Sequence, residues 1–317
     1  MLVNGVWKSK WDPVQKKDEQ GRFIRQSSAF RETISPTRIS AVKRGDIETL
    51  GVKLYVAYIC PWATRTLIAR SLLGLDAHIP VSIVDPQLSD SGWRFHGYPG
   101  STPAGQESIT YIHQLYTQAD RDYSGRATVP VLWDMADNTI INNESADIIR
   151  IFNNDLRSLH ASEVDLTPES LLQQIDRFNE RIYHTLNNGV YRAGFASSQE
   201  AYEEAYAELF TTLDALERHF ETQRYAVGNQ LTESDIRLFV TLVRFDVAYY
   251  GLFKTNKAQI GDYPNISDYM DRLLQMPAFS ENTNIDHIKA GYYSIKALNP
   301  AGIVPAGPEL HWFDYLK

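Results

Sequence analysis

The sequence predicts a two-domain protein in which a mixed α+β domain precedes an all-helical domain. The chain has 317 residues, about twice the length of a typical single domain. Between positions 51 and 155, short β-branched and aromatic runs alternate with helical ones, whereas residues 168–317 show helical periodicity only. Residues 1–50 keep neither period for long, so we expect an irregular N-terminal arm there.

The mixed domain begins with a strand–helix–strand unit. Val52–Tyr58 is rich in β-branched and aromatic residues and predicts a buried strand, and His78–Ile83 predicts a second one. Between them, Arg65–Leu73 has the pattern of a helix, and Pro61 suits its first position because a proline there loses no hydrogen bond. Cys60 therefore falls at or beside the N-cap of this helix.

The remainder of this domain is predicted to be helix, strand, strand and helix. A loop over Val84–Gln106 leads to a helix near Ile109–Gln118. Val129–Trp133 and Thr139–Asn142 predict two strands, and Ser145–Asn153 predicts a helix with one apolar face. The expected order is thus βαβ followed by αββα.

The second domain is predicted to be a helical bundle. Apolar residues recur every three or four positions along Leu171–Leu186 and again along Tyr202–Phe220. Thr232 and Asp235 have the spacing of a capping box, with Asp in place of the usual Glu, just before a helical pattern over Ile236–Tyr249.

The composition excludes several classes of function. Acidic residues outnumber basic ones by 39 to 31, for a formal net charge of −8, whereas nucleic acids and anionic membranes attract basic surfaces. We find no signal peptide and no apolar run of about 18 residues. The histidines have no ligand-like spacing. We therefore expect a cytoplasmic protein with no metal, no membrane segment and no nucleic-acid partner.

Cys60 is the main candidate for chemistry. A thiol at a helix N-terminus faces unpaired N–H groups and the positive end of the helix dipole, which both favour the thiolate. The alternative is a buried cysteine that acts as a small apolar residue; the neighbouring Pro61 favours the reactive interpretation. Cys60 is the only cysteine, so an external thiol must resolve any disulfide formed there. Glutathione is the abundant thiol of the cytoplasm.

Two further segments have features of a peptide-binding site. A cis bond before Pro130 would present the N–H and C=O groups of Val129 to a peptide, although a trans bond is the commoner case. A helix beginning at Glu144 and Ser145 is able to bind a carboxylate and an α-ammonium, although a plain N-cap is the simpler alternative. Packing or solvation is the simpler explanation, taken singly, for other candidates, namely Trp93, Arg94, Arg126, Tyr191, Tyr292 and Tyr293.

Together, these residues resemble the glutathionyl-hydroquinone reductases, the Xi class of the glutathione transferases. The resemblance covers nearly the whole chain. The matching motifs are Cys60-Pro61-Trp62-Ala63, Gly92-Trp93-Arg94-Phe95, Thr128–Asp134, Asn142–Ser145, Asp286–Lys289, Tyr292-Tyr293 and Leu298–Pro305. The first motif also occurs in Omega-class transferases, whereas the long arm and the C-terminal tail are more particular to the Xi class.

The resemblance implies a thioredoxin-like βαβ–ββα domain over 51–155, followed by a helical domain over 168–317 with a C-terminal extension and an aromatic substrate pocket. It implies a homodimer that reduces glutathionyl-hydroquinones with glutathione. By match, Cys60 is the nucleophile, and we assign the contact with the ring to Tyr191 and Tyr292, with Tyr293 as the alternative to Tyr292. The residues implied to hold glutathione are Trp93, Arg126, Val129, Pro130, Glu144 and Ser145.

Two positions depart from the family pattern. Thr64 stands where the family usually has a histidine, and the region around Gly291 lacks the common histidines and serine. The range of quinones therefore stays open. An Omega-like thiol transferase or dehydroascorbate reductase that uses the same Cys60 is an alternative function, and a non-enzymatic interaction module is another.

Overall fold

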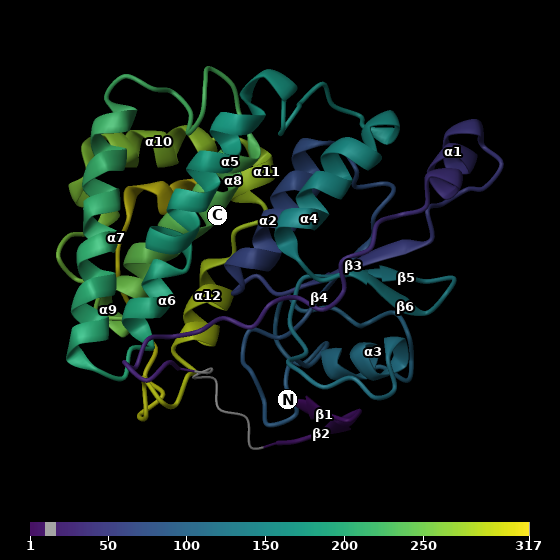
Figure 1. The fold of residues 1–317 in the computed structure, drawn as a ribbon, viewed down its shortest axis with the longest axis horizontal. Helices are drawn as coiled ribbons and strands as arrows, with labels where there is room; N and C mark the ends of the chain where they lie inside the picture. The colour runs from purple at the N-terminus through teal and green to yellow at the C-terminus, as the bar shows by residue number, and fades with distance from the viewer. Residues whose placement is uncertain (10–16, 317) are drawn as a thin grey trace. The chain divides into compact units, whose positions relative to one another are not determined.

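The computed structural model describes residues 1–9 and 17–316. These residues form two compact units, which are coloured by position along the chain in Figure 1. The first unit comprises residues 1–9 and 28–164, and the second comprises residues 17–27 and 165–316. The chain thus contributes a short segment to the second unit before it completes the first.

A four-stranded sheet forms the centre of the first unit. Its strands are β3 (Val52–Val56), β4 (Val81–Ile83), β5 (Val131–Asp134) and β6 (Thr139–Asn142), in the order β4-β3-β5-β6. β4 is parallel to β3, as a strand–helix–strand crossover requires. β5 is antiparallel to both β3 and β6. All residues of β5 are buried, which suits a central strand.

Three helices cover this sheet. α2 (Pro61–Leu72) and α4 (Ser145–Arg150) pack against each other on one face, and α3 (Ile112–Ala119) lies on the other (Figure 1). The expected order of strands and helices is therefore confirmed. α4 continues as a π-helical turn over Ile151–Asp155, so the last turn of the expected helix is wider than a regular one.

The expectation of an irregular arm over residues 1–50 is wrong in part. β1 (Leu2–Val3) and β2 (Val6–Trp7) form an antiparallel hairpin, and α1 (Pro36–Arg44) is a regular helix. Ile39 is the only buried residue of α1, so the helix has no apolar stripe from which its period can be read. Residues 10–16 of the expected arm lie outside the described part of the chain.

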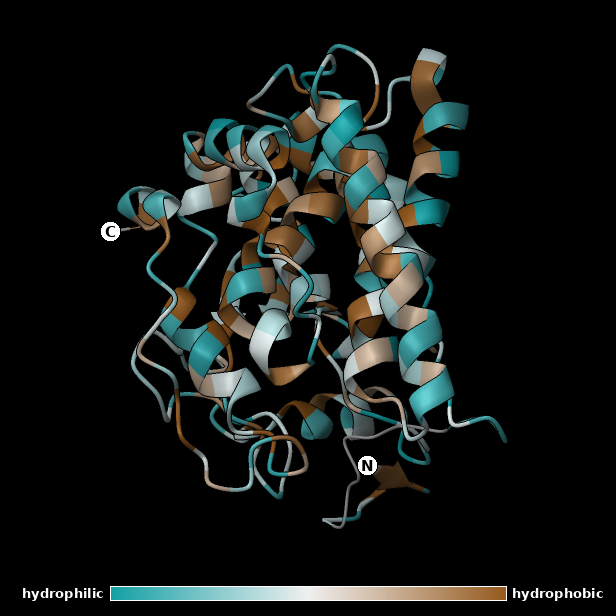
Figure 2. Ribbon diagram, turned by 90° about the vertical axis from the view of Figure 1, so that its left-hand side faces the viewer, coloured by the Kyte–Doolittle hydropathy of each residue, from teal (hydrophilic) through white to brown (hydrophobic). Residues whose placement is uncertain are grey.

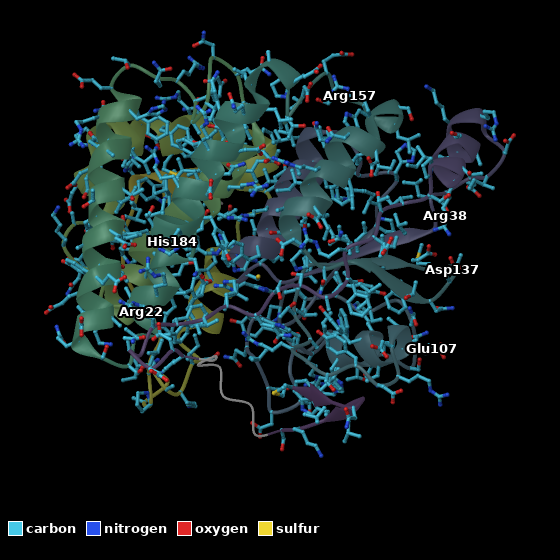
Figure 3. The ribbon with its side chains drawn as sticks, in the orientation of Figure 1. Arg22, Arg38, Glu107, Asp137, Arg157 and His184 are labelled. Carbon is cyan, nitrogen blue, oxygen red and sulfur yellow. The ribbon has the colours of Figure 1, made fainter. Side chains whose placement is uncertain are left out.

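Ion pairs hold α1 to the sheet of the first unit. The guanidinium of Arg38 lies 2.5 Å from a carboxylate oxygen of Asp134 and 3.6 Å from one of Asp137. Figure 3 labels Arg38 and Asp137, which lie near each other at the end of β5. α1 is thus held by charge at a surface, which a hydrophobic pattern does not reveal.

The second unit is built from helices. The α-helices are α5 (Leu172–Ile182), α6 (Gly189–Gly194), α7 (Gln199–Phe220), α8 (Glu233–Arg244), α9 (Tyr250–Leu252), α10 (Pro264–Leu274), α11 (Pro277–Ser280) and α12 (Ile285–Tyr292). Shorter helical turns are Arg157–Leu159 in the first unit and Glu169–Leu171, Tyr183–Asn187, Phe245–Tyr249, Ile260–Asp262 and His311–Leu316 in the second. The longer helices carry apolar and polar residues on different faces (Figure 2). Within the described residues, no helix is long and apolar enough to cross a membrane.

The predicted capping box at the start of α8 is confirmed. Thr232 is the N-cap, and Asp235 accepts a hydrogen bond from the Thr232 N–H at 2.8 Å. Asp235 also accepts hydrogen bonds from the Ala226 N–H and the Tyr269 hydroxyl, at 2.8 and 2.9 Å. The carboxylate is fully buried, and burial raises its pKa to about 6. This helix start is therefore closed by its own side chains.

Candidate active site

Cys60 lies at the N-cap of α2, as the sequence predicts. β3 ends at Val56, a turn closed by the hydrogen bond from the Cys60 N–H to the Ala57 carbonyl (3.0 Å) follows, and Pro61 begins the helix. Cys60 has extended dihedral angles, φ −77° and ψ 114°, and makes no side-chain cap hydrogen bond. The thiol is half-buried. It thus stands at the positive end of the helix dipole.

The Cys60 thiol contacts the segment before β5. Its Sγ lies 3.5 Å from the carbonyl oxygen of Val129. The two come together because β5 pairs with β3, with Tyr55 opposite Val131. The bond between Val129 and Pro130 is cis, a question that the sequence left open. A backbone carbonyl next to the thiol is well placed to pair with a bound peptide.

Thr64 takes the position at which the resemblance leads one to expect a histidine. It is fully buried in α2. Its hydroxyl donates to the carbonyl of Cys60 at 3.0 Å, four residues earlier in the helix. This side chain therefore reinforces the first turn of α2 and supplies no titratable group near the thiol.

Glu144 and Ser145 begin α4, and the structure shows the N-cap arrangement there. Glu144 is the N-cap, and its Oε1 accepts a hydrogen bond from the Ala146 N–H at 3.2 Å. The Ser145 hydroxyl lies 3.5 Å from the same oxygen. The Ser28 hydroxyl donates to the other oxygen, Oε2, at 2.8 Å. Ser28 lies 116 positions before Glu144, so the sequence pattern did not indicate this contact.

Trp93 and Arg126 lie on two separate loops of the same unit. The Trp93 carbonyl accepts a hydrogen bond from the Ile112 N–H at 2.9 Å, which ties its loop to the start of α3. The Arg126 carbonyl accepts one from the Tyr123 hydroxyl at 3.1 Å. Both side chains are half-buried. The first unit therefore contains every residue to which the resemblance gives a glutathione contact.

Three tyrosine hydroxyls form a chain in the second unit. The Tyr292 hydroxyl, on α12, lies 2.6 Å from that of Tyr191 on α6 and 2.8 Å from that of Tyr249. Burial raises the pKa of Tyr292 and of Tyr249 well above the usual value, so both stay protonated at neutral pH. Of the two neighbouring tyrosines considered above, Tyr292 and not Tyr293 joins Tyr191.

The sequence did not indicate two members of this cluster. Tyr249 is one tyrosine among 18, and it gives no local signal. Arg25 belongs to the N-terminal arm, and its guanidinium lies 4.8 Å from the centre of the Tyr191 ring. The Arg25 Nε–H also donates to the side-chain oxygen of Asn188 at 2.9 Å. A cation over an aromatic face is attracted by the ring, so Arg25 helps to hold Tyr191.

No group of three or more His, Cys, Asp or Glu side chains suited to a metal ion occurs in the described parts of the chain. The arrangement has instead one thiol beside a backbone carbonyl, with carboxylate and hydroxyl groups at a helix start. Such groups can bind a small peptide and exchange disulfides with it.

Two domain families match the chain, one in each half. The glutathione S-transferase N-terminal domain matches residues 59–155, and the glutathione S-transferase C-terminal domain matches residues 199–272. These matches confirm the expected thioredoxin-like domain followed by a helical domain.

Curated relatives cover nearly the full length. The glutathionyl-hydroquinone reductase PcpF of Sphingobium chlorophenolicum is 45% identical over 97% of this chain and 96% of its own. The glutathionyl-hydroquinone reductase YqjG of Escherichia coli is 46% identical over 99% of this chain and 95% of its own.

Solved structures also resemble this chain over most of its length. The crystal structure of the glutathione S-transferase Xi from Phanerochaete chrysosporium has a TM-score of 0.86 at 45% identity, over 92% of this chain and 95% of that one. The glutathione-bound structure of YqjG has a TM-score of 0.86 at 43% identity, over 98% and 97% of the two chains. The chain therefore belongs to the glutathionyl-hydroquinone reductase family, the Xi class of the glutathione transferases.

Proposed function

We propose that the chain reduces glutathionyl-hydroquinones to hydroquinones with glutathione as the reductant and glutathione disulfide as the second product. The observation that carries this proposal is the position of its only thiol, Cys60, at the start of α2 and 3.5 Å from the Val129 carbonyl. A peptide that pairs with the backbone of Val129 brings its cysteine sulfur close to Cys60. PcpF and YqjG bear the name of the same activity.

In the first step, the Cys60 thiolate attacks the sulfur of the glutathionyl-hydroquinone. A disulfide forms between Cys60 and glutathione, and the bond between that sulfur and the ring carbon breaks. Its electron pair passes to the ring, which takes up a proton and leaves as the hydroquinone. The sulfur atoms are oxidised to a disulfide and the ring carbon is reduced, so the electrons balance.

In the second step, the thiolate of another glutathione attacks the glutathione sulfur of the mixed disulfide. Glutathione disulfide leaves, and the Cys60 thiolate is restored. Because Cys60 is the only thiol of the chain, this second glutathione replaces the resolving cysteine that other thiol-disulfide enzymes carry.

We assign binding of the glutathione moiety to the domain at 51–155. Glu144 suits the α-ammonium group, and the N–H groups and hydroxyl at Ser145 suit the α-carboxylate next to it. Arg126 suits a second carboxylate, because guanidinium and carboxylate form strong paired hydrogen bonds. The other residues assigned to this moiety are Trp93, Val129 and Pro130.

We assign the aromatic part of the substrate to the helical domain at 168–317. An aryl carbon is a poor leaving group, so the ring needs a hydrogen bond that steers it toward a keto-like tautomer. Tyr191 and Tyr292 are assigned this role as proton donors. The raised pKa of Tyr292 keeps its proton available at neutral pH.

A homodimer in the cytoplasm completes the proposal. The dimer follows from the resemblance to Xi-class transferases, and the compartment from the need for reduced glutathione. Light scattering after size-exclusion chromatography should give about twice the chain mass of 36.1 kDa; a value equal to one chain would contradict the dimer.

The test of the activity is turnover of glutathionyl-menadiol with glutathione by the wild type, Cys60→Ala and Cys60→Ser. We expect free menadiol and glutathione disulfide from the wild type, and loss of both products in the two variants. Mass spectrometry of the protein mixed with substrate alone should show one glutathione attached at Cys60.

Other outcomes would overturn parts of the proposal. Full turnover by Cys60→Ser would remove Cys60 from the nucleophile role. Reduction of dehydroascorbate that depends on Cys60, without turnover of glutathionyl-menadiol, would indicate the Omega-like function instead.

A further inference from the structure

The N-terminal hairpin contacts the loop that carries Trp93. The indole N–H of Trp7, in β2, donates to the carbonyl of Asp90 at 2.8 Å. The Trp7 ring also lies so close to Gly92 that a Cβ atom there would be 2.9 Å from ring atom Cη2. Gly92 has a φ of +84° and immediately precedes Trp93. The turn before Trp93 is thus fitted to the indole of Trp7.

Trp7 connects this loop to α3. Its ring stacks on His113 with 4.5 Å between the ring centres and an angle of 21°. Burial lowers the pKa of His113 to about 4, so the imidazole is neutral at physiological pH. The residue before it, Ile112, donates its N–H to the Trp93 carbonyl. Trp7 therefore touches both elements that hold the backbone around Trp93.

The same hairpin contacts the segment that carries Arg126. Leu2 in β1 exchanges two backbone hydrogen bonds with Gly125, at 2.9 and 3.0 Å. The Gly5 N–H donates to the Tyr123 carbonyl at 3.0 Å. A Cβ atom at Gly5 would collide with the Arg121 carbonyl oxygen. The hairpin turn is therefore in direct backbone contact with the residues just before Arg126.

We infer that the hairpin Leu2–Trp7 positions Trp93 and Arg126 for binding of glutathione, with Trp7 as its main positioning residue. This inference rests on the proposed function, which assigns these two loop residues to glutathione. Both lie on irregular loops, whose orientation depends on such contacts more than that of helix or strand residues does. A loop already held in its binding conformation loses less entropy when the ligand binds.

The experiment measures binding of S-methylglutathione by calorimetry. This thioether cannot exchange with Cys60, so the measurement does not depend on turnover. We expect Trp7→Ala to raise the Kd about tenfold, which corresponds to the loss of one well-made polar contact. Trp7→Phe keeps one aromatic ring but loses the indole N–H and part of the ring surface, so its Kd should lie between those of the wild type and Trp7→Ala. In turnover, Trp7→Ala should raise the KM for glutathione and change kcat less than about twofold.

Val6→Ala is the matched control. Val6 is the neighbour of Trp7 in β2, but its side chain is 56% exposed, so we expect its Kd to equal that of the wild type. Gly5→Ala tests the other contact, because the added methyl group must push the hairpin away from Arg121. It should raise the Kd as Trp7→Ala does.

The outcomes separate this inference from the proposed function. An unchanged Kd in Trp7→Ala and in Gly5→Ala, whatever their thermal stability, would overturn the inference and leave the function standing. An equal rise in Val6→Ala would also overturn it, because the effect would then reflect general loosening of the hairpin. A wild type that does not bind S-methylglutathione would overturn both.

Discussion

The N-termini of α2 and α8 share the same helix-dipole electrostatics but differ in function. Both stand at the positive end of a helix dipole. At α8, Thr232 is the N-cap, and the Asp235 carboxylate in the first turn accepts hydrogen bonds from Thr232, Ala226 and Tyr269, all fully or nearly fully buried. At α2, the N-cap is Cys60, whose side chain makes no cap hydrogen bond and is half-buried.

The difference shows that the N-terminus of a helix is able to serve either stability or reactivity. A carboxylate that closes the helix start internally holds the fold together and offers nothing to a ligand. A thiol at the N-cap gains little for the fold, but the dipole favours its reactive form. The two helix starts therefore predict opposite responses to substitution.

The largest expected effect is on activity, at the start of α2. Cys60→Ser should reduce turnover of glutathionyl-menadiol at least ~10³-fold, because a serine hydroxyl does not attack sulfur at neutral pH. The free energy of unfolding should stay equal or rise by up to ~1 kcal/mol, because serine is a good N-cap residue. Steady-state kinetics and urea unfolding measure the two quantities. A loss of stability above ~1 kcal/mol would contradict the expectation that Cys60 contributes little to the stability of the fold.

The next effect is on stability, at the start of α8. Asp235→Ala should lower the free energy of unfolding by ~3 kcal/mol, because it leaves buried donors on Thr232, Ala226 and Tyr269 without an acceptor. Asp235→Asn keeps one acceptor oxygen and should lose about half as much. Urea unfolding is the measurement. If Asp235→Ala unfolds like the wild type, the capping network does not stabilise the fold.

The third expected effect is on kcat and concerns the tyrosine hydroxyls of the second unit. Tyr292→Phe removes the middle hydroxyl of the tyrosine chain and should lower kcat about 10- to 100-fold without a change in the KM for glutathione. Tyr293→Phe is the control, because its hydroxyl lies outside the chain Tyr191–Tyr292–Tyr249. Equal kcat values for the two variants would remove the tyrosines from the mechanism.

The smallest expected effect is a pH response of the first unit. Burial, and after it the charge of the N-terminal amino group, lowers the pKa of His113 from 6.5 to about 4. Between pH 6.5 and 4 the unfolded chain takes up this proton and the folded chain does not, so stability falls as the pH falls. The group is partly exposed, so we expect a loss of only ~1 kcal/mol.

His113→Phe isolates this response. Phenylalanine keeps a ring against Trp7 and Tyr111, the aromatic neighbours of His113, but does not titrate. The stability difference between wild type and variant should therefore shrink or reverse between pH 7 and pH 4, when both are unfolded in urea. A pH-independent difference would contradict the assignment to His113.

The contribution of Asp235 to stability depends on pH in the opposite direction. Burial raises its pKa to about 6, so its contribution is lost as the pH rises through that value.

Local signals predicted much of the fold. The βαβ and αββα order, the position of Cys60 at an N-cap and the Thr232–Asp235 capping box all depend on residues within one turn or strand of each other. Proline at the first helical position and β-branched runs act over the same short range. Such features are visible in the sequence because the cause and the structure are neighbours in the chain.

The remaining features depend on contacts between distant positions. Tyr191 and Tyr292 are 101 positions apart, and Ser28 and Glu144 are 116 apart. The hairpin at Leu2–Trp7 and the helix α1 have too few buried residues to show a period. Their places depend on hydrogen bonds and ion pairs with other segments, which leave no pattern in the sequence around them.

The tyrosine chain also has a direction. Each hydroxyl has a single hydrogen to donate, so the bonds joining Tyr249, Tyr292 and Tyr191 can run one way or the other. When they run toward Tyr191, its hydroxyl accepts from Tyr292, and when they run toward Tyr249, it donates to Tyr292. Rotation of O–H bonds therefore switches the Tyr191 hydroxyl between donor and acceptor toward Tyr292, while every heavy atom stays in place.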